Sequence, residues 1–479
     1  MDLSEDWIIL GVAVAGFFYI SGIVLAVDAV MTVRTSQGSI AWIVSLLTFP
    51  YVAVPLYWVF GRRKYLGYID ARRTESKDMQ PLIDDIIPEL PEFTARPSDD
   101  HMNFRVMEEL AAMPFTRRND AELLVNGDKT FEAIFEEIES AKEYLLVQFF
   151  IIKDDRLGRE FQSALMRKAA QGVRVYLLYD EIGCIRLPGS YLKELRNAGV
   201  IVSPFNTTKG IRNRFQLNFR NHRKVVIADG RVAFTGGLNV GDEYMGRSTA
   251  LGPWRDTHVC VHGPAVQALQ FTFVEDWYWA THSVPNLEWK PVLPQSADKS
   301  ILVVPSGPAD DLETCGLFFV HAIHSAKRRV WISSPYFVPN SKVVAALQIA
   351  ALRGVDVRIL LPEKADHILV WLSSFSYYNE TEPFGVRLYR YQPGFLHQKA
   401  MLIDDEIAAI GSANLDNRSF RLNFEIMLLI VDADFGARMR TMFEEDFASS
   451  RMVEQGELDA RPVWFKFAVG VARLLAPIQ

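Results

Sequence analysis

Two long apolar runs open the pattern of hydrophobic and polar positions. Residues 7–27 and 36–60 carry no formal charge, and each run has roughly the 20 residues that cross the hydrocarbon core of a bilayer. Acidic residues precede the first run, whereas a cleaved signal peptide begins with basic residues and has a shorter apolar region. The pattern therefore predicts a two-helix transmembrane hairpin over residues 1–65, with buried helices of a soluble domain as the alternative.

The charges that follow predict on which side of that membrane the chain continues. Basic residues come directly after the second run, at Arg62, Arg63 and Lys64, and such residues stay on the cytoplasmic side. We therefore expect both ends of the hairpin, and the domain that follows, in the cytoplasm. Residues 66–115 include prolines among acidic residues, which discourage long helices and predict a linker.

Beyond the linker the pattern changes to alternating helices and strands. Helical periodicity over residues 130–141 and 161–170 alternates with apolar, β-prone runs over residues 144–152 and 173–179. This order predicts an α/β domain in which helices cover a sheet.

The same unit returns later in the chain. The matching residues include Ser140, Ala141 and Lys142 in the first copy and Ser325, Ala326 and Lys327 in the second. A spacing this long is not that of a solenoid repeat. The duplication predicts two homologous halves, residues 116–290 and 291–455, which pair about a pseudo-two-fold axis and bring corresponding residues to one cleft.

The carboxyl-terminal segment, residues 456–479, mixes aromatic and aliphatic residues with Lys466 and Arg473. It is too short and too charged to span a bilayer. Two structures fit the pattern equally: an interfacial helix whose cations extend toward water, and a terminal helix packed on the domain.

The composition excludes several classes of protein. With 51 basic against 58 acidic residues, the net charge is −7, so the chain as a whole does not attract nucleic acid. An apolar content of 49% excludes a mainly disordered protein. Cys184, Cys260 and Cys315 form no CxxC pair, which indicates neither a disulfide framework nor a cysteine zinc site. We expect no metal and no cofactor.

One local stretch is basic and contains interleaved aromatic residues. It comprises Lys209, Arg212, Arg214, Phe215, Phe219, Arg220 and Arg223. Such a stretch is compatible with single-stranded nucleic acid or with lipid head groups. The predicted membrane helices favour lipid.

The candidate chemistry lies in a pattern that occurs twice. Each copy has His-x-Lys in an apolar run, an Asp seven positions after the His and an Asn seventeen positions after it. The residues are His222, Lys224, Asp229 and Asn239 in the first copy, and His397, Lys399, Asp404 and Asn414 in the second. Alternate side chains of a strand share a face, so each imidazole has an ammonium beside it. One such pattern would be a weak signal, but two copies with matching downstream residues are a strong one.

These residue types suit phosphoryl transfer without a metal. A neutral imidazole attacks phosphorus and a protonated one delivers a proton to the leaving oxygen, because the ordinary histidine pKa near 6.5 permits both forms at neutral pH. Lys224 and Lys399 would offset the charge of a bound phosphodiester. Asn239 and Asn414 would donate amide hydrogens to its oxygens.

Two groups of residues near the histidines have structural explanations to weigh. Asp229 and Asp404 occupy positions where a strand turns back, for which Asp is a preferred residue. We expect a structural role for them. Gly236, Gly237 and Gly411 precede the Asn of each copy. They could simply relieve crowding, but we expect them to let the backbone approach a ligand closely.

On these motifs the chain resembles the bacterial cardiolipin synthases of the phospholipase D superfamily, whose mark is two HxKxxxxD motifs. The segments RNHRKVVIADGRVAFTGGLN and GFLHQKAMLIDDEIAAIGSANLDNRSF extend the likeness, as does the amino-terminal hairpin, and it covers nearly the whole chain. The resemblance implies an α/β fold of two phospholipase D-like half-domains, each a mixed sheet flanked by helices. It also implies a multi-pass protein of the bacterial cytoplasmic membrane.

The resemblance further implies a reaction. A phosphatidyl group passes from one phosphatidylglycerol to another, giving cardiolipin and glycerol through a phosphohistidine intermediate. By this analogy His222 is the nucleophile and His397 the acid and base. A carboxylate downstream of each motif, at Asp256 and Glu425, orients the imidazoles and fixes their tautomer. The implied partners are phosphatidylglycerol and other membrane lipids, not nucleic acid.

Three other functions share parts of this pattern. A membrane-bound phospholipase D, or another phosphatidyltransferase, would use the same catalytic residues with water or a different alcohol, because the pocket selects the acceptor. A nuclease of the superfamily would degrade DNA, and a lipid-binding scaffold would need neither histidine. The residues alone leave open which histidine is the nucleophile, whether copies of the chain assemble into a homo-oligomer, and which acyl chains are preferred.

Overall fold

The computed structural model describes residues 3–33, 36–61, 90–98, 102–205, 218–248 and 251–479. The chain forms two compact units, one of Met1–Ala71 with Thr207–Phe219 and one of Arg72–Asn206 with Arg220–Gln479. The basic flank at residues 62–64, much of the predicted linker and the first part of the basic stretch lie outside the described residues.

The amino-terminal unit contains the helices α1 (Leu3–Thr32), α2 (Ser36–Thr48) and α3 (Pro50–Phe60). The sequence predicted one helix over residues 36–60, and that prediction is wrong, because the helix is interrupted at Phe49. Pro50 has no backbone N–H and disfavours a helical conformation in the preceding residue, and Phe49 has a φ of −131°. Pro50 instead begins α3, where its missing N–H is not needed.

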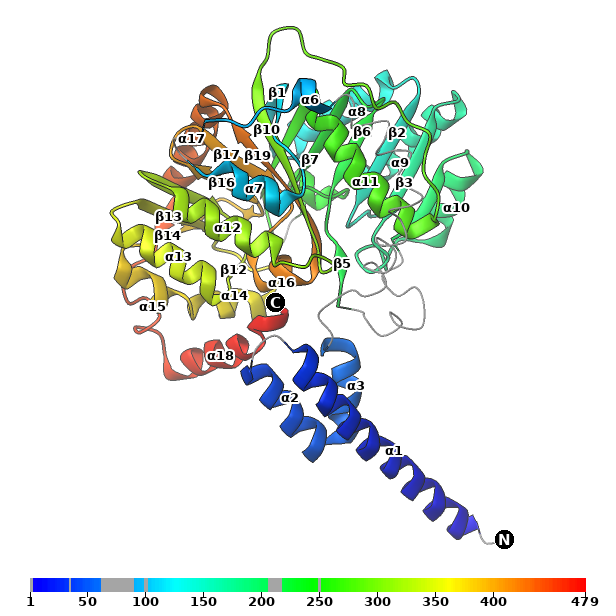
Figure 1. The fold of residues 1–479 in the computed structure, drawn as a ribbon, viewed down its shortest axis with the longest axis vertical. Coiled ribbons are helices and arrows are strands. Elements are labelled where there is room, and N and C mark those ends of the chain that lie inside the picture. The colour runs from blue at the N-terminus through cyan, green and yellow to red at the C-terminus, as the bar shows by residue number, and fades with distance from the viewer. Residues whose placement is uncertain (1–2, 34–35, 62–89, 99–101, 206–217, 249–250) are drawn as a thin grey trace. The chain divides into compact units, whose positions relative to one another are not determined.

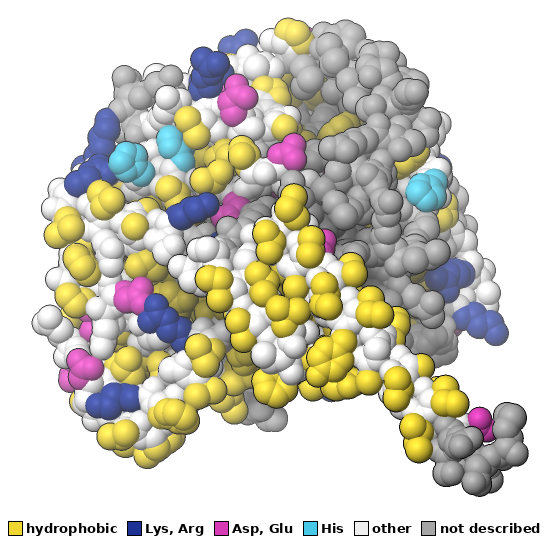
Figure 2. All heavy atoms as spheres, turned by 60° about the horizontal axis from the view of Figure 1, so that its bottom comes forward, with side chains coloured by type: hydrophobic (Ala, Val, Ile, Leu, Met, Phe, Trp, Pro, Cys, Tyr) yellow, Lys and Arg dark blue, Asp and Glu magenta, His cyan; other side chains and the backbone are white. Residues whose placement is uncertain are grey.

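Among the described residues, α1 is the one helix long and apolar enough to cross a membrane, over Asp6–Thr32. It packs against α2 and α3 through a small cluster that includes Ala29, Leu46 and Tyr57. Most other side chains of α1 are exposed, and Figure 2 shows hydrophobic side chains along these helices almost without interruption. An exposed apolar surface of this extent indicates an association with a membrane.

The second unit is a mixed α/β fold of two halves. The strands of the first half are β1 (Thr116–Val125), β2 (Tyr144–Phe149), β3 (Arg174–Tyr179), β4 (Ile201–Pro204), β6 (Val225–Ala228), β7 (Val232–Gly236) and β9 (Thr257–His262). Those of the second are β10 (Lys299–Ser306), β11 (Arg329–Ser333), β13 (Asp356–Pro362), β14 (Arg387–Tyr391), β16 (Ala400–Ile403), β17 (Ile407–Gly411), β19 (Asn423–Val431) and β20 (Ser450–Met452).

The two halves repeat one strand order. The first runs β1-β9-β7-β6-β2-β3-β4 and the second β10-β19-β17-β16-β11-β13-β14, with β20 added at its edge. β1 and β10 pair antiparallel in the middle, with Thr116 opposite Ile301, and join the halves into one sheet. The connections explain part of the mixture of parallel and antiparallel pairs. Helices link sequential parallel strands such as β2 and β3, and tight turns link the antiparallel pairs β6–β7 and β16–β17.

Helices cover both faces of this sheet (Figure 1). In the first half they are α8 (Asn126–Ser140), α9 (Arg156–Ala170), α10 (Gly189–Asn197) and α11 (Ala265–Thr281). In the second they are α12 (Thr314–Ser325), α13 (Ser341–Leu352), α14 (Ile368–Phe375), α15 (Tyr378–Thr381), α16 (Asn417–Arg421), α17 (Ala433–Ala448) and α18 (Val463–Leu474), while α6 (Leu90–Phe93) and α7 (Phe104–Ala111) precede β1. The helices and strands predicted between residues 130 and 179 are confirmed as α8, β2, α9 and β3, with ends shifted by a few residues.

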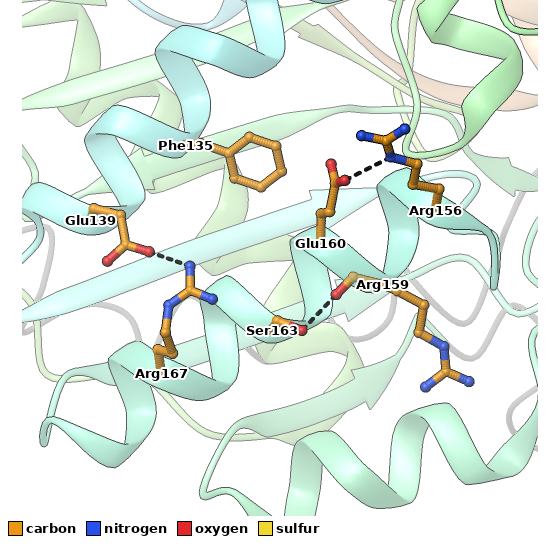
Figure 3. Close-up of a pocket in the computed structure, with 7 residues that line it drawn as sticks. All are labelled: Phe135, Glu139, Arg156, Arg159, Glu160, Ser163 and Arg167. Carbon is orange, nitrogen blue, oxygen red and sulfur yellow. Dashed lines mark hydrogen bonds and ion pairs between the residues drawn. The ribbon is translucent and has the colours of Figure 1, made fainter.

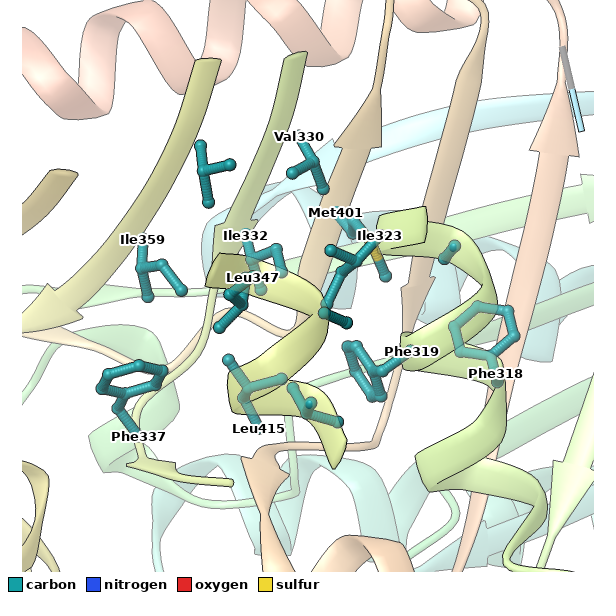
Figure 4. Packing of buried hydrophobic residues seen from close by; sticks show 14 of the residues in the cluster. Phe318, Phe319, Ile323, Val330, Ile332, Phe337, Leu347, Ile359, Met401 and Leu415 are labelled. Carbon is teal, nitrogen blue, oxygen red and sulfur yellow. The ribbon is translucent and has the colours of Figure 1, made fainter. Parts of the chain in front are cut away.

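Alternate residues of a central strand point to the two helical layers. In β2, Leu145 and Val147 join the cluster formed with α8 and α9, whereas Gln148 donates to Asp276 of α11 at 2.7 Å. In the second half, Ile332 packs with α12 and α13 (Figure 4). A sheet covered on both faces requires nearly continuous apolar strands, which explains why these runs contain so few charged residues.

Three very short strands lie where the halves meet. β5 (Arg220–Asn221) pairs in parallel with the start of β19, and β15 (Phe395–Leu396) pairs in parallel with β8 (Trp254–Arg255). A further short pair, β12 (Phe337–Val338) and β18 (Leu415–Asp416), lies within the second half. The two pairings between halves occur immediately before the motif histidines, so the backbone of one half positions the histidine of the other.

Candidate active site

Each motif histidine is held by the opposite half. The backbone N–H of His222 donates to the carbonyl of Phe424 at 2.9 Å, and that of His397 donates to the carbonyl of Arg255 at 2.8 Å. These bonds continue the short parallel pairings, so they fix the backbone position of each histidine relative to the other half. Both histidines are buried.

A carboxylate contacts the Nδ1 atom of each imidazole. Nδ1 of His222 lies 2.9 Å from Oε2 of Glu425, and Nδ1 of His397 lies 2.7 Å from Oδ2 of Asp256. Such a contact favours the tautomer that carries its proton on Nδ1 and leaves Nε2 free. The resemblance placed each carboxylate downstream of its own motif, and the structure pairs each with the histidine of the other half.

Both imidazoles line one pocket of about 250 Å³. Its lining residues come from the two halves and are Phe150, Ile151, His222, Asn239, Glu243, Tyr244, Leu251, Trp254, Tyr336, Asp366, His367, His397 and Asn414. Aromatic rings fix the imidazoles, with Phe150 centred 5.0 Å from His222 and Trp254 centred 5.1 Å from His397. The two halves thus share one cavity, as the duplication predicted.

The motif lysines are buried beside the histidines and bond to their backbone. Nζ of Lys224 donates to the carbonyl of His222 at 2.6 Å. Nζ of Lys399 lies 2.5 Å from the carbonyl of His397 and 2.9 Å from its Nδ1. Within the described residues, the pocket lining includes neither lysine. Both lysines therefore act on the pocket indirectly, through the histidine segments, and burial lowers the pKa of Lys224 well below its usual range.

Burial dominates the electrostatics of the site. It lowers the pKa of His222 to about 4, although the Glu425 carboxylate opposes the shift. Burial and Lys399 also lower the pKa of His397, and burial lowers that of Lys399 to about 8. In this structure both imidazoles are neutral at neutral pH. A bound phosphodiester anion would raise their pKa values, because a nearby negative charge favours the protonated form.

The two carboxylates stay ionised despite their burial. Burial alone would raise the pKa of Asp256, but His397 and Lys399 together bring it below the ordinary value. The pKa of Glu425 is lowered in the same way by His222, against the effect of burial. Each carboxylate can therefore stabilise an imidazolium that forms beside it.

The two motif asparagines line the pocket but differ in their contacts. Oδ1 of Asn239 accepts from the N–H of Ile151 at 3.1 Å, and its Nδ2 donates to the Tyr244 hydroxyl at 3.1 Å. In the part of the chain that the structure describes, the buried side-chain oxygen of Asn414 has no hydrogen-bond partner. Asn239 is thus held by the protein, whereas the amide group of Asn414 is available to a bound molecule. Phosphate binding by either residue stays a prediction.

The motif aspartates directly follow β6 and β16, and these strands begin after the motif lysines. The prediction that each His and Lys lie on one strand is therefore wrong, because both residues precede it. Both aspartates have left-handed backbone conformations, with φ of 52° for Asp229 and 51° for Asp404. Asp229 accepts the backbone N–H groups of residues 142–144, and Asp404 accepts those of residues 327–329. Each carboxylate therefore fixes the loop before a central strand, β2 or β11, away from the pocket.

One expectation about neighbouring residues is wrong. A Cβ atom on Gly237 would lie 2.0 Å from Oδ1 of Asp256, and one on Gly411 would lie 2.1 Å from the carbonyl of Ile426. These glycines make room for protein atoms rather than for a ligand.

The last residue of the basic stretch, Arg223, is buried and pairs with Asp276 at 2.9 Å. Since residues 209–217 lie outside the described residues, lipid binding by this stretch stays a prediction.

The sequence reasoning missed the groups that hold Glu425. This carboxylate accepts from Ser412 at 2.5 Å, Ser419 at 2.8 Å and Asn423 at 3.0 Å. Ser412 stands between the Gly and the Asn of the second motif, and that position was a usable signal. It also missed Tyr336 and Asp366, which are bonded to each other at 2.6 Å at the pocket.

A larger hollow of about 560 Å³ lies elsewhere, between α8 and α9 (Figure 3). Its three arginines are each paired with a carboxylate: Arg156 with Glu160, Arg159 with Glu194 and Arg167 with Glu139. None of the repeated motif residues lines it among those described. The hollow is therefore a salt-bridged surface between two helices.

The fold and the paired histidine–carboxylate site define a phospholipase D-like protein. Among solved structures, the chain is similar to phosphatidylserine synthase from Haemophilus influenzae Rd KW20, with a TM-score of 0.60 over 78% of this chain and 99% of that one. The sequence identity is 16%, so this likeness concerns the fold.

Sequence comparisons identify the family to which the chain belongs within the phospholipase D-like proteins. A family described as "Cardiolipin synthase, PLD-like domain" matches residues 134–277 and 319–447, and one described as "Phospholipase_D-nuclease N-terminal" matches residues 22–62. Proteins named cardiolipin synthase A are 52% identical over 463 residues in Pseudomonas fluorescens and 51% identical over 468 residues in Pseudomonas syringae pv. syringae. These matches cover 95% and 97% of this chain, and 96% and 98% of the relatives. The chain belongs to the phospholipase D-like cardiolipin synthase family.

Proposed function

We propose that this chain is a phosphatidyltransferase that joins two molecules of phosphatidylglycerol into cardiolipin and releases glycerol. The observation that supports it best is the pair of carboxylate-bound imidazoles at one pocket. Two such imidazoles beside one phosphodiester provide both a nucleophile and an acid–base group. The curated relatives, named cardiolipin synthase A, support this choice of reaction.

In the first step, Nε2 of His222 attacks the phosphorus of one phosphatidylglycerol. A phosphorus–nitrogen bond forms, the bond to the glycerol head group breaks, and His397 gives its proton to the departing glycerol oxygen. The Glu425 carboxylate at Nδ1 stabilises the positive charge that develops on the His222 ring.

In the second step, a hydroxyl of the second phosphatidylglycerol head group replaces the imidazole. His397, now neutral, removes the hydroxyl proton while the oxygen attacks phosphorus. The phosphorus–nitrogen bond breaks, which restores His222 and yields cardiolipin. The two steps consume two phosphatidylglycerols and produce one cardiolipin and one glycerol.

The surroundings of the two histidines support His222 as the nucleophile. Its pKa is lowered to about 4, so it is neutral over the whole neutral range, as a nucleophile must be. His397 has the Asp256 carboxylate at Nδ1, which raises the pKa of that ring against the effects of burial and Lys399, and an anionic substrate would raise this pKa further toward the range that an acid needs. Lys224, Lys399 and the Asn414 amide would stabilise the phosphate charge.

The membrane arrangement is part of the same proposal. We infer a cytoplasmic-membrane protein of a bacterium, with residues 1–65 in the membrane as a hairpin in which α2 and α3 together pack against α1. Residues 116–290 and 291–455 are catalytic halves in the cytoplasm, following a linker over residues 66–115. The apolar α1 supports the membrane location. The repeated strand order and the reciprocal β5–β19 and β8–β15 pairings support a pseudo-two-fold relation of the halves.

Product analysis tests the reaction. The purified chain, reconstituted in phosphatidylglycerol vesicles, should convert them to cardiolipin and an equal amount of glycerol, measured by mass spectrometry. His222→Ala and His397→Ala should each abolish conversion, whereas His324→Ala, an exposed histidine of α12, should not. Phosphatidic acid without cardiolipin would instead identify a hydrolase, and cleavage of labelled DNA would identify a nuclease.

Trapping the intermediate tests the nucleophile. Rapid acid-free quenching followed by peptide mapping should locate a phosphatidyl group on the peptide that contains His222, and His222→Ala should lose it. An adduct on His397 in the unaltered protein would reverse the assignment of the two histidines.

A further inference from the structure

The carboxyl-terminal helix α18 has two apolar faces. Phe465, Val469 and Ala472 form the buried one. The Phe465 ring lies 5.2 Å from that of Phe375 and 6.1 Å from that of Trp371, both on α14. This face therefore fixes α18 to the second half, and Figure 1 shows the two helices side by side.

The other face is exposed. Trp464, Phe467, Val471 and Leu474 recur every three or four residues, a spacing that places them on one stripe of a helix. Trp464 is 70%, Phe467 74% and Leu474 78% exposed. A terminal helix that served only to close the domain would need the buried face alone, so the second stripe requires another explanation.

Exposed apolar residues also occur where α14 begins, next to the pocket. α14, to which α18 is bound, begins at Ile368, and Ile368 and Leu369 are exposed apolar residues. The two residues just before them, Asp366 and His367, line the catalytic pocket. Ile368, Leu369, Trp464, Phe467, Val471 and Leu474 form what we name the α14–α18 surface.

We propose that the α14–α18 surface inserts into the interfacial region of a lipid bilayer and holds the pocket mouth at the level of the head groups. The inference rests on the proposed lipid substrate: a phosphodiester can reach the histidines while its acyl chains stay in the bilayer only if the rim touches the membrane. The rim is apolar at the residues that adjoin the pocket. Of the two cations on α18, Arg473 is paired with Glu380 and Lys466 donates to the backbone carbonyl of Asp459, so the contact with lipid is made by the apolar side chains of the stripe.

Site-directed labelling tests the contact in the full chain. Cys184, Cys260 and Cys315 are buried, so a fluorophore will react with an introduced cysteine. The label on Phe467→Cys, in vesicles of phosphatidylglycerol and phosphatidylethanolamine, should be quenched by lipids that carry a nitroxide on the acyl chain. The label on Leu352→Cys, an exposed position on α13, should not. Equal quenching at both positions, or at neither, would overturn the proposal.

A comparison of activity on vesicles and on dispersed lipid tests whether the membrane contact matters for catalysis. The triple variant Trp464→Ser, Phe467→Ser and Leu474→Ser removes exposed side chains and should leave the fold intact, as checked by thermal unfolding. Its cardiolipin formation from vesicles should fall at least about tenfold, since three apolar anchors are lost. Its rate with dispersed short-chain phosphatidylglycerol should match that of the unaltered chain, and Leu352→Ser should change neither rate.

The outcomes separate this proposal from the proposed function. Failure of the unaltered chain to make cardiolipin from short-chain lipid would refute the function. Normal activity of the triple variant on vesicles, or an equal loss on both substrates, would refute only the membrane contact. A nitroxide at position 467 that reports a short distance to the same position of another copy would identify a protein–protein interface, and would also overturn the proposal.

Discussion

The two halves of the catalytic unit have the same strand order and the same motif, yet their histidines lie in different surroundings. Glu425, which contacts His222, accepts from the side chains of Ser412, Ser419 and Asn423. Asp256, which contacts His397, accepts from the backbone N–H of Thr257 at 2.8 Å and from the Trp254 indole at 3.3 Å. The two halves therefore have the same backbone fold around their histidines, and the neighbouring side chains make the two imidazoles different.

The lysines differ between the halves as well. Lys399 reaches both the ring and the carbonyl of its histidine, whereas Lys224 bonds to the carbonyl of His222 and lies over the Phe150 ring. A symmetric site would have two equivalent imidazoles and no reason for one to act as nucleophile. These differences show how a duplicated fold can hold one histidine suited to act as a nucleophile and another suited to act as an acid and base.

The largest expected effect comes from removing the charge of either carboxylate. Glu425→Gln and Asp256→Asn keep the shape of the side chain but lose the charge that stabilises an imidazolium, so each should lower kcat by roughly 10²- to 10⁴-fold. Adduct formation should separate them, because Glu425→Gln impairs the nucleophile and Asp256→Asn the acid. Identical adduct kinetics in the two variants would mean that the halves are chemically equivalent.

The next largest loss of activity is expected from substituting the motif lysines. Lys224→Met and Lys399→Met each remove a buried cation near the phosphate, which should reduce kcat/KM by roughly 10²-fold. Asn414→Ala serves as a reference, since this side chain lines the pocket directly. Lys399→Met should also favour protonation of His397, because Lys399 lowers the pKa of that ring; no such shift should follow Lys224→Met.

The pH dependence of activity should also show that the two histidines differ, with a smaller change in rate than the substitutions above. His222 must be neutral and has a pKa of about 4, so activity should be lost on the acid side only below the mildly acidic range. His397 must be protonated in the first step, so activity should fall as pH rises through its pKa. The Asp256 carboxylate raises that pKa, and Asp256→Asn should move the alkaline limb of the kcat/KM profile to lower pH. A shift of the acid limb instead would reverse the roles.

The smallest effect on catalysis should come from the motif aspartates. Asp229→Asn and Asp404→Asn weaken bonds to three backbone N–H groups each, which should lower the free energy of unfolding by about 1–3 kcal/mol. Asp404 is more deeply buried and should show the larger loss. Denaturant unfolding measures this, and kcat of the folded protein should stay near normal. A large kcat loss without destabilisation would assign these residues to the chemistry.

Much of the fold followed from periodicity. Apolar runs with the spacing of strands and helices predicted α8, β2, α9 and β3, because the strands are buried on both faces and each helix buries one face. The break at Phe49 could also have been read from Pro50, whose chemistry acts on the adjacent residue. Local rules of this kind need no knowledge of distant residues.

The sequence by itself determined the paired motifs, since the His, Lys, Asp and Asn of each copy lie within one short segment that contains a single β-hairpin. Only the tertiary structure decided that Glu425 contacts His222 and Asp256 contacts His397, across the junction of the halves. It also decided that Gly237 and Gly411 make room for protein atoms. These contacts join residues far apart in the chain, and the distances between such residues depend on how the sheets pack, which no local spacing encodes.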